Sequence, residues 1–232
     1  MQRAIEIASI IRKESDIPAL EERIKERKSA LMAAYYNSWD GNFIGNLQGA
    51  NAFALDIGLG DDRTKESFIK YYENIGHFDT GIFGTDIVTR LLFEYGRGDV
   101  ACRLLAASEP HGFGKWRELG ATSLWEEWYN SRSLSHPMFG AVVAYLFEYV
   151  LGIRQAEGSV AFDKVIISPA KIDALDKAHG YITTPHGKIS VSYVTENEAM
   201  QVTVDVPEGV NAEVILPNGE TKAVSGHMTI EF

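Results

Sequence analysis

The chain has 232 residues, of which 45% are hydrophobic, and a formal net charge of −10. This length and apolar content suffice for one large domain or two modest ones, and they argue against global disorder. The negative charge argues against nucleic acid as a partner, because such binding needs a basic surface that displaces counterions. Cys102 is the only cysteine, which excludes an intrachain disulfide and a zinc–thiolate site.

No stretch of the sequence is long and apolar enough to span a bilayer, and residues 1–14 lack the apolar core of a signal peptide. If Met1 is the natural start, a cytoplasmic protein without a membrane partner fits best. Cys102 lies in an apolar run, so we expect a small buried side chain there and not a reactive thiol. The residue pattern indicates neither a metal ion nor a cofactor.

Apolar residues recur at helical spacing up to about residue 155. Asp16 and Pro18 suit the first turn of a long helix, and Pro137 and Gly152 suit the two ends of the last one. Short loops between the helices indicate helical hairpins, and we place this region at 1–155. The predicted helices cover 5–12, 16–35, 45–58, 64–75, 85–95, 99–108 and 137–152. In the last helix we expect these residues to be buried: Phe139, Val143, Leu146, Phe147 and Val150.

After Glu157 the apolar residues alternate with a period of two, which is typical of strands. Turn residues occur at 184–187, 207–209 and 217–219, and we expect a loop or a single helical turn at 169–177. The sequence therefore predicts an antiparallel β-sandwich over 156–232, so the fold class is mainly α with a C-terminal all-β domain. The predicted strands are 159–167, 180–183, 188–194, 200–206, 212–216 and 228–232.

The connection between residues 108 and 137 is far longer than the ~2–8 residues usual between paired helices, and long loops often carry function. It contains Trp116, Trp125 and Trp128, together with the carboxylates of Glu126 and Glu127. Indole rings beside carboxylates suit a sugar, whose C–H face stacks on a ring while its hydroxyls bind the carboxylates. The alternative is that these tryptophans only pack the connection onto the helices.

Two sequence blocks in this region resemble the signature of bacterial α-L-rhamnosidases, which are glycoside hydrolases with a six-hairpin (α/α) toroid. The first is Gly-Ala-Thr-Ser-Leu-Trp-Glu-Glu-Trp at 120–128, and the second is Ser-Leu-Ser-His-Pro-Met-Phe-Gly at 133–140. The family pattern is Gly-Ala-Thr-Thr-x-Trp-Glu-x-Trp, then a loop, then Ser-x-Asn-His-x-x-Phe-Gly. Weaker similarity at 80–85, around Gln48 and within 183–217 follows the family order, so the resemblance covers nearly the whole chain.

The resemblance implies removal of terminal α-L-rhamnose from a rhamnosylated small molecule or oligosaccharide, with inversion at the anomeric carbon. An inverting hydrolase uses one carboxylic acid and one carboxylate, about 6.5–9.5 Å apart. In the family motif, Glu126 matches the general base and His136 matches a histidine that contacts rhamnose. Trp125 and Trp128 match aromatic residues around that site. Because adjacent side chains project in different directions, we expect Glu127 to point outward.

Other residues could line a pocket, although nothing in their spacing requires it. Trp39, Gln48 and His77 lie at predicted helix ends or in loops. Apart from the resemblance, Glu126 has an alternative interpretation as a solvent-exposed loop acid, and His136 as a helix cap.

The sequence also departs from the family pattern. It has no upstream motif of Asp and Arg that ends in Glu, where the family carries its general acid; residues 61–63 are nearest in composition but follow the segment around Gln48. The stretch 127–135 is shorter than its family counterpart, and Ser135 replaces the usual asparagine. A closed toroid needs twelve helices, more than the predicted helices supply. We therefore expect a partial (α/α) six-hairpin toroid, either the C-terminal part of a longer enzyme or a product that lost its front half.

An incomplete toroid would expose apolar helix faces, which predicts self-association or association with a missing N-terminal half. On this interpretation the chain retains the general base of the enzyme and lacks the general acid. Two alternatives stay open: a non-catalytic carbohydrate-binding or assembly module derived from this fold, and a six-hairpin glycosidase of other sugar specificity.

Overall fold

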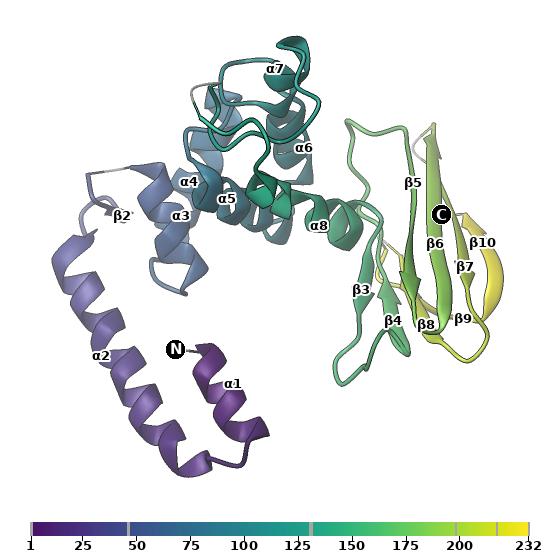
Figure 1. Cartoon of the computed structure of the whole chain (residues 1–232), viewed down its shortest axis with the longest axis horizontal. Coiled ribbons are helices and arrows are strands. Elements are labelled where there is room, and N and C mark those ends of the chain that lie inside the picture. Colours follow the sequence, from purple (N-terminus) through teal and green to yellow (C-terminus); the bar gives the residue numbers. More distant parts are fainter. Residues whose placement is uncertain (1, 46, 130–131, 198, 217, 232) are drawn as a thin grey trace. The chain divides into compact units, whose positions relative to one another are not determined.

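The computed structural model describes residues 2–45, 47–129, 132–197, 199–216 and 218–231. It confirms a helical first part followed by β-sheets, which is the fold class expected from the sequence (Figure 1). Internal contacts divide the chain into two compact units, Met1–Asn74 and Ile75–Phe232. Pro217 of the third expected turn and Phe232 of the last expected strand lie outside the described residues.

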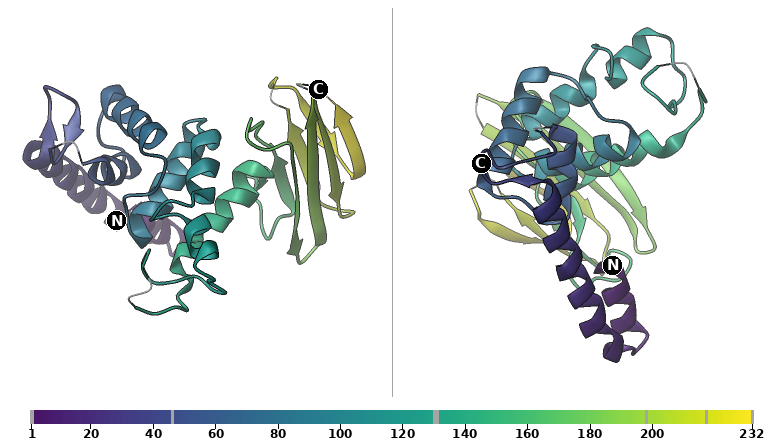
Figure 2. Two further views of the ribbon diagram at one scale, coloured as in Figure 1. Left: turned by 90° about the horizontal axis from the view of Figure 1, so that it is seen from above. Right: turned by 90° about the vertical axis from the view of Figure 1, so that its left-hand side faces the viewer.

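The first unit is built from helices and one short hairpin. Helices α1 and α2 run antiparallel side by side, and Pro18 lies in the first turn of α2 as expected (Figures 1 and 2). None of the 19 residues of α2, all of which are described, is buried, although Met32 packs against a small core of Phe43, Ala54 and Leu59. The elements are α1 (Gln2–Ile10), η1 (Glu14–Asp16), α2 (Ile17–Tyr35), β1 (Tyr36–Asn37), β2 (Asn42–Phe43), α3 (Gln48–Asp56) and α4 (Asp62–Ile75).

The helical part of the second unit contains the remaining predicted helices and a short additional one, α7. Residues 137–150, predicted as one α-helix, form a 3₁₀ helix, a short α-helical stretch and a π turn in succession. Phe139 and Val150 are buried as expected. The expectation was wrong for Val143 and Leu146, which are 48% and 37% exposed, because each change of helical period rotates the apolar face. The elements are α5 (Ile82–Glu94), α6 (Gly98–Ala106), α7 (Phe113–Glu118), η2 (Pro137–Val142), α8 (Val143–Tyr145) and η3 (Leu146–Val150).

The C-terminal part of the second unit is a two-layer β-sandwich (Figure 1). One sheet has the strand order β10-β7-β6-β5 and is antiparallel throughout. The other has the order β3-β4-β8-β9, in which β4 and β8 are parallel, contrary to the wholly antiparallel prediction. The sequence pattern missed β3 and β9, which have only three and four residues. The strands are β3 (Ile153–Gln155), β4 (Lys164–Ile167), β5 (Lys177–Thr184), β6 (Gly187–Glu196), β7 (Ala199–Val206), β8 (Asn211–Ile215), β9 (Thr221–Val224) and β10 (Gly226–Glu231).

Cys102 lies in α6 and is partly buried. Burial raises the pKa of its thiol to about 11, which agrees with a packing role and disfavours the reactive thiolate. In the described part of the chain, no helix has the length and apolarity needed to cross a membrane. Nor do any three His, Cys, Asp or Glu side chains of the described residues gather as a candidate metal site.

Candidate active site

The connection between α6 and η2 folds back on itself at the rhamnosidase-like motif. Glu126 donates its backbone N–H to the carbonyl oxygen of Ser133 at 2.9 Å, and His136 donates to that of Leu124 at 2.7 Å. These two bonds join the two sequence blocks of the motif, so Glu126 and His136 lie on the two sides of one loop. The intervening residues 130–131 lie outside the described part of the chain.

Buried aromatic rings pack this loop onto the helices. Trp116, Trp125 and Trp128 are only 3%, 5% and 8% exposed. The ring centroid of Trp116 lies 5.5 Å from that of Trp125 and 5.1 Å from that of Trp128, and Phe139 lies 4.4 Å from Trp128. The indole N–H of Trp128 donates to the carbonyl oxygen of Thr80 at 2.6 Å. The structure thus places the two candidate aromatic residues, Trp125 and Trp128, within the packed core.

Glu126 itself reaches solvent, with 32% of its side chain exposed. One carboxylate oxygen lies 3.9 Å from Nη1 of Arg132, and the other accepts the backbone N–H of Ser133 at 3.4 Å. Glu127 is also partly exposed, and its carboxylate lies 2.7 Å from Nε of Arg132. Arg132 therefore contacts both acids but binds Glu127 more closely. A solvent-accessible carboxylate held on a packed loop can accept a proton from water, as a general base does.

His136 precedes η2 at the N-cap position, but its side chain makes no capping hydrogen bond. The ring is partly buried, and its Nδ1 atom is buried without a hydrogen-bond partner among the described residues. The alternative role of His136 as a side-chain helix cap is therefore absent from this structure.

His77, a candidate pocket residue, belongs to a polar chain that the sequence did not reveal. Its Nδ1 lies 2.8 Å from the carbonyl oxygen of Phe78, and Nδ1 of His111 lies 2.9 Å from the same oxygen. The Nε2 atom of His111 lies 2.9 Å from the hydroxyl of Tyr129. His111 has a φ of +54°, in the left-handed region that non-glycine residues rarely adopt. Sequence reasoning passed over His111 and Tyr129, because only the fold brings His111 to the Phe78 carbonyl and Tyr129 to His111.

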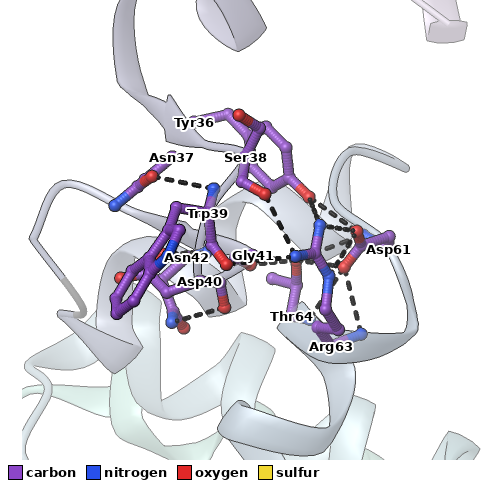
Figure 3. A network of polar contacts seen from close by, with 10 residues as sticks. All are labelled: Tyr36, Asn37, Ser38, Trp39, Asp40, Gly41, Asn42, Asp61, Arg63 and Thr64. Atoms are coloured by element: carbon purple, nitrogen blue, oxygen red, sulfur yellow. Dashed lines mark hydrogen bonds and ion pairs between the residues drawn. The ribbon is translucent and has the colours of Figure 1, made fainter.

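The candidate residues Trp39 and Gln48 belong to the first unit and occupy opposite environments. Trp39 is 87% exposed, and in Figure 3 its indole points away from the Arg63–Asp61 pair. Gln48 is 4% exposed, and its side-chain oxygen accepts a hydrogen bond from Asn51 at 2.9 Å. Asn51 also donates to the Asn42 side chain at 2.7 Å, so Gln48 is part of a buried amide cluster.

A network of polar contacts fixes the loop that carries Trp39 (Figure 3). Arg63 donates to the carbonyl oxygens of Ser38 and Trp39 at 3.0 and 3.3 Å, and pairs with Asp61 at 2.8 Å. The Tyr36 hydroxyl donates to Asp61 at 2.6 Å. The hydrogen bond from Tyr36, followed by that from Arg63, holds the pKa of Asp61 well below its usual range.

Both parts of the chain match models of one protein family. Residues 1–150 match the bacterial alpha-L-rhamnosidase six-hairpin glycosidase domain, and residues 152–231 match the bacterial alpha-L-rhamnosidase C-terminal domain. The order of the two matches agrees with the order of the helical region and the sandwich along the chain.

Curated relatives give the same result. An α-L-rhamnosidase of Alteromonas sp. (strain LOR) is 33% identical over 153 residues, which cover 61% of this chain and 16% of the relative. One from Formosa agariphila is 25% identical over 235 residues, which cover 94% of this chain and 25% of the relative. The chain thus spans a quarter or less of the length of these relatives.

Solved structures share the fold. The native α-L-rhamnosidase of Aspergillus terreus superposes with a TM-score of 0.87 at 20% identity, covering 97% of this chain and 28% of that one. The α-L-rhamnosidase of Streptomyces avermitilis, solved in complex with L-rhamnose, superposes with a TM-score of 0.81 at 24% identity, covering 98% of this chain and 24% of that one. Together with the family matches over both parts, these similarities show that the chain belongs to the bacterial α-L-rhamnosidase family.

Proposed function

We propose that this chain serves the hydrolysis of terminal α-L-rhamnosides, with Glu126 as the general base. The observation that carries the proposal is the family motif folded as one loop, in which Glu126 reaches solvent above a packed aromatic core. The hydrogen bonds at Glu126 and His136 hold the two motif blocks together. We assign residues 1–155 to the catalytic region and 156–232 to an accessory sandwich. The cytoplasmic location expected from the sequence stays a prediction.

The proposed reaction inverts the anomeric configuration. Glu126 removes a proton from a water molecule, whose oxygen attacks the anomeric carbon from the face opposite the aglycone. The bond from that carbon to the glycosidic oxygen breaks, and a carboxylic acid donates a proton to the departing oxygen. His136 contacts sugar hydroxyls, and Trp125 and Trp128 keep the base in place from the core. His77, Gln48 and Trp39 have no assigned step.

We propose that the general acid is not supplied by this chain. A general acid needs a carboxyl group with a raised pKa, so that it is protonated at working pH. Asp61, in the segment nearest to the family acid motif in composition, has a lowered pKa because Tyr36 and Arg63 stabilise its charged form. The pKa is lowered in every described carboxyl group whose shift is clear. These groups are Asp61, Asp99, Glu118, Asp163 and Asp205.

A partner that completes the helical region follows from this proposal. Helix α2 buries none of its residues, all of which are described, and Ile10, Ile11 and Tyr35 in the first unit are 79%, 60% and 51% exposed. Apolar exposure of this kind favours association. We propose that the N-terminal helices of a rhamnosidase six-hairpin domain, and not a second copy of this chain, cover this surface and bring the acid.

The test is hydrolysis of an aryl α-L-rhamnoside by the chain alone and by the chain co-expressed with the N-terminal part of a related rhamnosidase. We expect little activity from the chain alone and a gain on complementation. Glu126→Gln should lower the restored kcat by a factor of about 10²–10⁴, which is the usual contribution of a general base. The neighbouring Glu127→Gln is the matched control and should retain most of the activity.

Normal hydrolysis by the chain alone, lost in Glu126→Gln, would show that the acid lies within this chain. Full activity of Glu126→Gln in the complemented enzyme would refute the base assignment. The missing upstream motif of Asp and Arg that ends in Glu also favours a second candidate, a non-catalytic carbohydrate-binding module. Sugar binding that persists in Glu126→Gln, without turnover on complementation, would establish it. Cleavage of another aryl glycoside in preference to the rhamnoside would identify a different sugar specificity.

A further inference from the structure

Tyr129 differs in its exposure from the other aromatic residues of the motif loop, by which we mean the connection at 111–136. Its side chain is 58% exposed, whereas Trp116, Trp125 and Trp128 are all below 10%. Among the described residues of 111–129, it is the exposed aromatic ring next to the candidate base. The ring that solvent and ligands can reach is therefore Tyr129, although the sequence motif draws attention to the tryptophans.

The hydroxyl of Tyr129 is anchored, although its ring is exposed. Nδ1 of His111 must donate to the Phe78 carbonyl oxygen, which can only accept, so in the neutral ring Nε2 is the acceptor for the Tyr129 hydroxyl. The two rings also meet edge to face, with centroids 5.4 Å apart at 78°. The far end of Tyr129 is thus tied to the backbone of another segment of the fold.

The anchor itself is rigid. Phe78 is fully buried and stacks on Trp128 with ring centroids 5.9 Å apart and planes within 7°. His111 stacks on the same Trp128 ring at 6.2 Å. The order from the core outward is therefore Phe78 and Trp128, then His111, then Tyr129. An exposed ring held in this way loses little conformational entropy when a ligand binds to its face.

Tyr129 is also close to Glu126 along the chain. Three residues span at most ~10–11 Å even when fully extended, and the bond from Glu126 to Ser133 closes the same loop. The backbones of Glu126 and Tyr129 therefore lie within ~11 Å of each other. The C–H face of a pyranose is apolar and packs well against a tyrosine ring, while its hydroxyls stay available to Glu126 and His136.

We propose that Tyr129 is a substrate-contacting residue, whose ring is the platform on which the apolar face of a pyranoside stacks beside Glu126. His111 is the positioning residue that holds this ring. The inference rests on the proposed glycosidase function of the loop, but it concerns binding and not proton transfer.

The test is binding of methyl α-L-rhamnoside to the full chain, measured by saturation-transfer NMR and calorimetry. Tyr129→Ala should weaken binding about 2- to 12-fold, and Tyr129→Phe should bind more tightly than Tyr129→Ala because it keeps the ring. Tyr181→Ala is the matched control, since Tyr181 is 57% exposed in β5, and it should bind as the wild type does. Thermal unfolding of each variant verifies the fold.

His111→Asn tests the positioning role, because asparagine tolerates the positive φ, but its shorter side chain cannot reach both the Phe78 carbonyl oxygen and the Tyr129 hydroxyl as the imidazole does. It should weaken binding when Tyr129 is present and have no further effect in the Tyr129→Ala background. A purely structural role for His111 would give equal losses in both backgrounds.

Each of the other outcomes decides either the proposal for Tyr129 or the assignment of Glu126 as the general base. Equal binding by wild type and Tyr129→Ala overturns the platform, whatever Glu126→Gln does to hydrolysis in the complemented enzyme. Binding of a different methyl glycoside, weakened by Tyr129→Ala, supports the platform and contradicts rhamnose as the sugar. No binding of any methyl glycoside at tens of millimolar overturns the platform, while the base assignment is still decided by hydrolysis.

Discussion

Two loops of this chain are fixed by opposite means. The loop at 36–43 is held by Arg63, Asp61 and Tyr36 in a network at the surface, where the side chains of Arg63 and Asp61 are 49% and 41% exposed. The connection at 111–136 is held by tryptophans that are less than 10% exposed. Directional polar contacts define a backbone path with little burial, whereas packed rings define it through the core.

The difference predicts where stability resides. Exposed ion pairs contribute ~0–1 kcal/mol, because solvent and salt screen them. Truncation of a buried tryptophan costs ~3–5 kcal/mol, because it removes apolar burial and leaves a cavity. The stability of the loop that carries the candidate base should therefore depend on the core of the second unit. The loop that carries Trp39 should instead lose stability at low pH and at high salt.

The largest effect is expected for Trp116→Ala. This change removes a ring that contacts both Trp125 and Trp128 and leaves the Trp128 carbonyl without its indole donor. We expect a loss of ~3–5 kcal/mol in the free energy of unfolding, measured by urea denaturation. The control is Trp39→Ala, which removes an 87% exposed indole and should change stability by less than ~0.5 kcal/mol. Similar losses in the two variants would contradict the comparison.

An intermediate effect is expected for Asp61→Asn, and it should depend on pH. The pKa of Asp61 is lower in the folded than in the unfolded state, so its charged form stabilises the fold. This stabilisation is present above the unfolded pKa of ~3.9 and disappears as the pH falls toward the folded value. After allowance for solvent screening, we expect about 1 kcal/mol or less at pH 7, seen as a lower Tm.

The sign of this pH effect can be verified directly. The difference in Tm between wild type and Asp61→Asn should shrink as the pH is lowered below about 4. Asp62→Asn is the neighbouring control, because Asp62 is not part of the network in Figure 3. A difference that grows on acidification would mean that Asp61 is not stabilised in its charged form.

The smallest effect is expected for Arg132→Ala. The Arg132 side chain is 64% exposed, so solvent and salt screen its contacts with Glu127 and Glu126. We expect a change of less than ~0.5 kcal/mol in the free energy of unfolding, and a smaller one still in high salt. A loss comparable to that of Trp116→Ala would show that ion pairing and not packing holds the motif loop.

Much of the fold could be predicted because local signals agree with it. Helical periodicity and Pro18 identified α2, and Gly152, which has a φ of +73°, marks the end of the last helix. The mixed 3₁₀ and π geometry of 137–150 could not be predicted, since periodicity assumes a constant turn. The parallel pairing of β4 with β8 could not be predicted either, because side chains alternate between the two faces of a sheet in parallel and antiparallel strands alike.

The candidate site shows the same limit. The motif singles out Glu126, and in the structure this side chain reaches solvent. Burial of Trp125 and Trp128 depends on contacts with Trp116 and Phe139, which no spacing rule predicts. His111 and Tyr129 are 18 residues apart, and both depend on the carbonyl of Phe78, which lies 33 residues before His111. Sequence identifies the chemistry of a side chain, while tertiary packing decides which side chains reach solvent.

The parallel pair in the sandwich sets an order of folding. Lys164 to Ile167 of β4 align with Asn211 to Val214 of β8. The second sheet therefore cannot close until the chain between these two strands, residues 168–210, has been made and has folded back. The meander β5-β6-β7 within that stretch consists of local hairpins, whose contacts close short loops and form fast. During synthesis, β4 can pair only with β3 until β8 has left the ribosome, so one of its edges stays open for strand addition. A newly made chain therefore passes through a stage in which one edge of β4 is open to pairing with a strand of another chain.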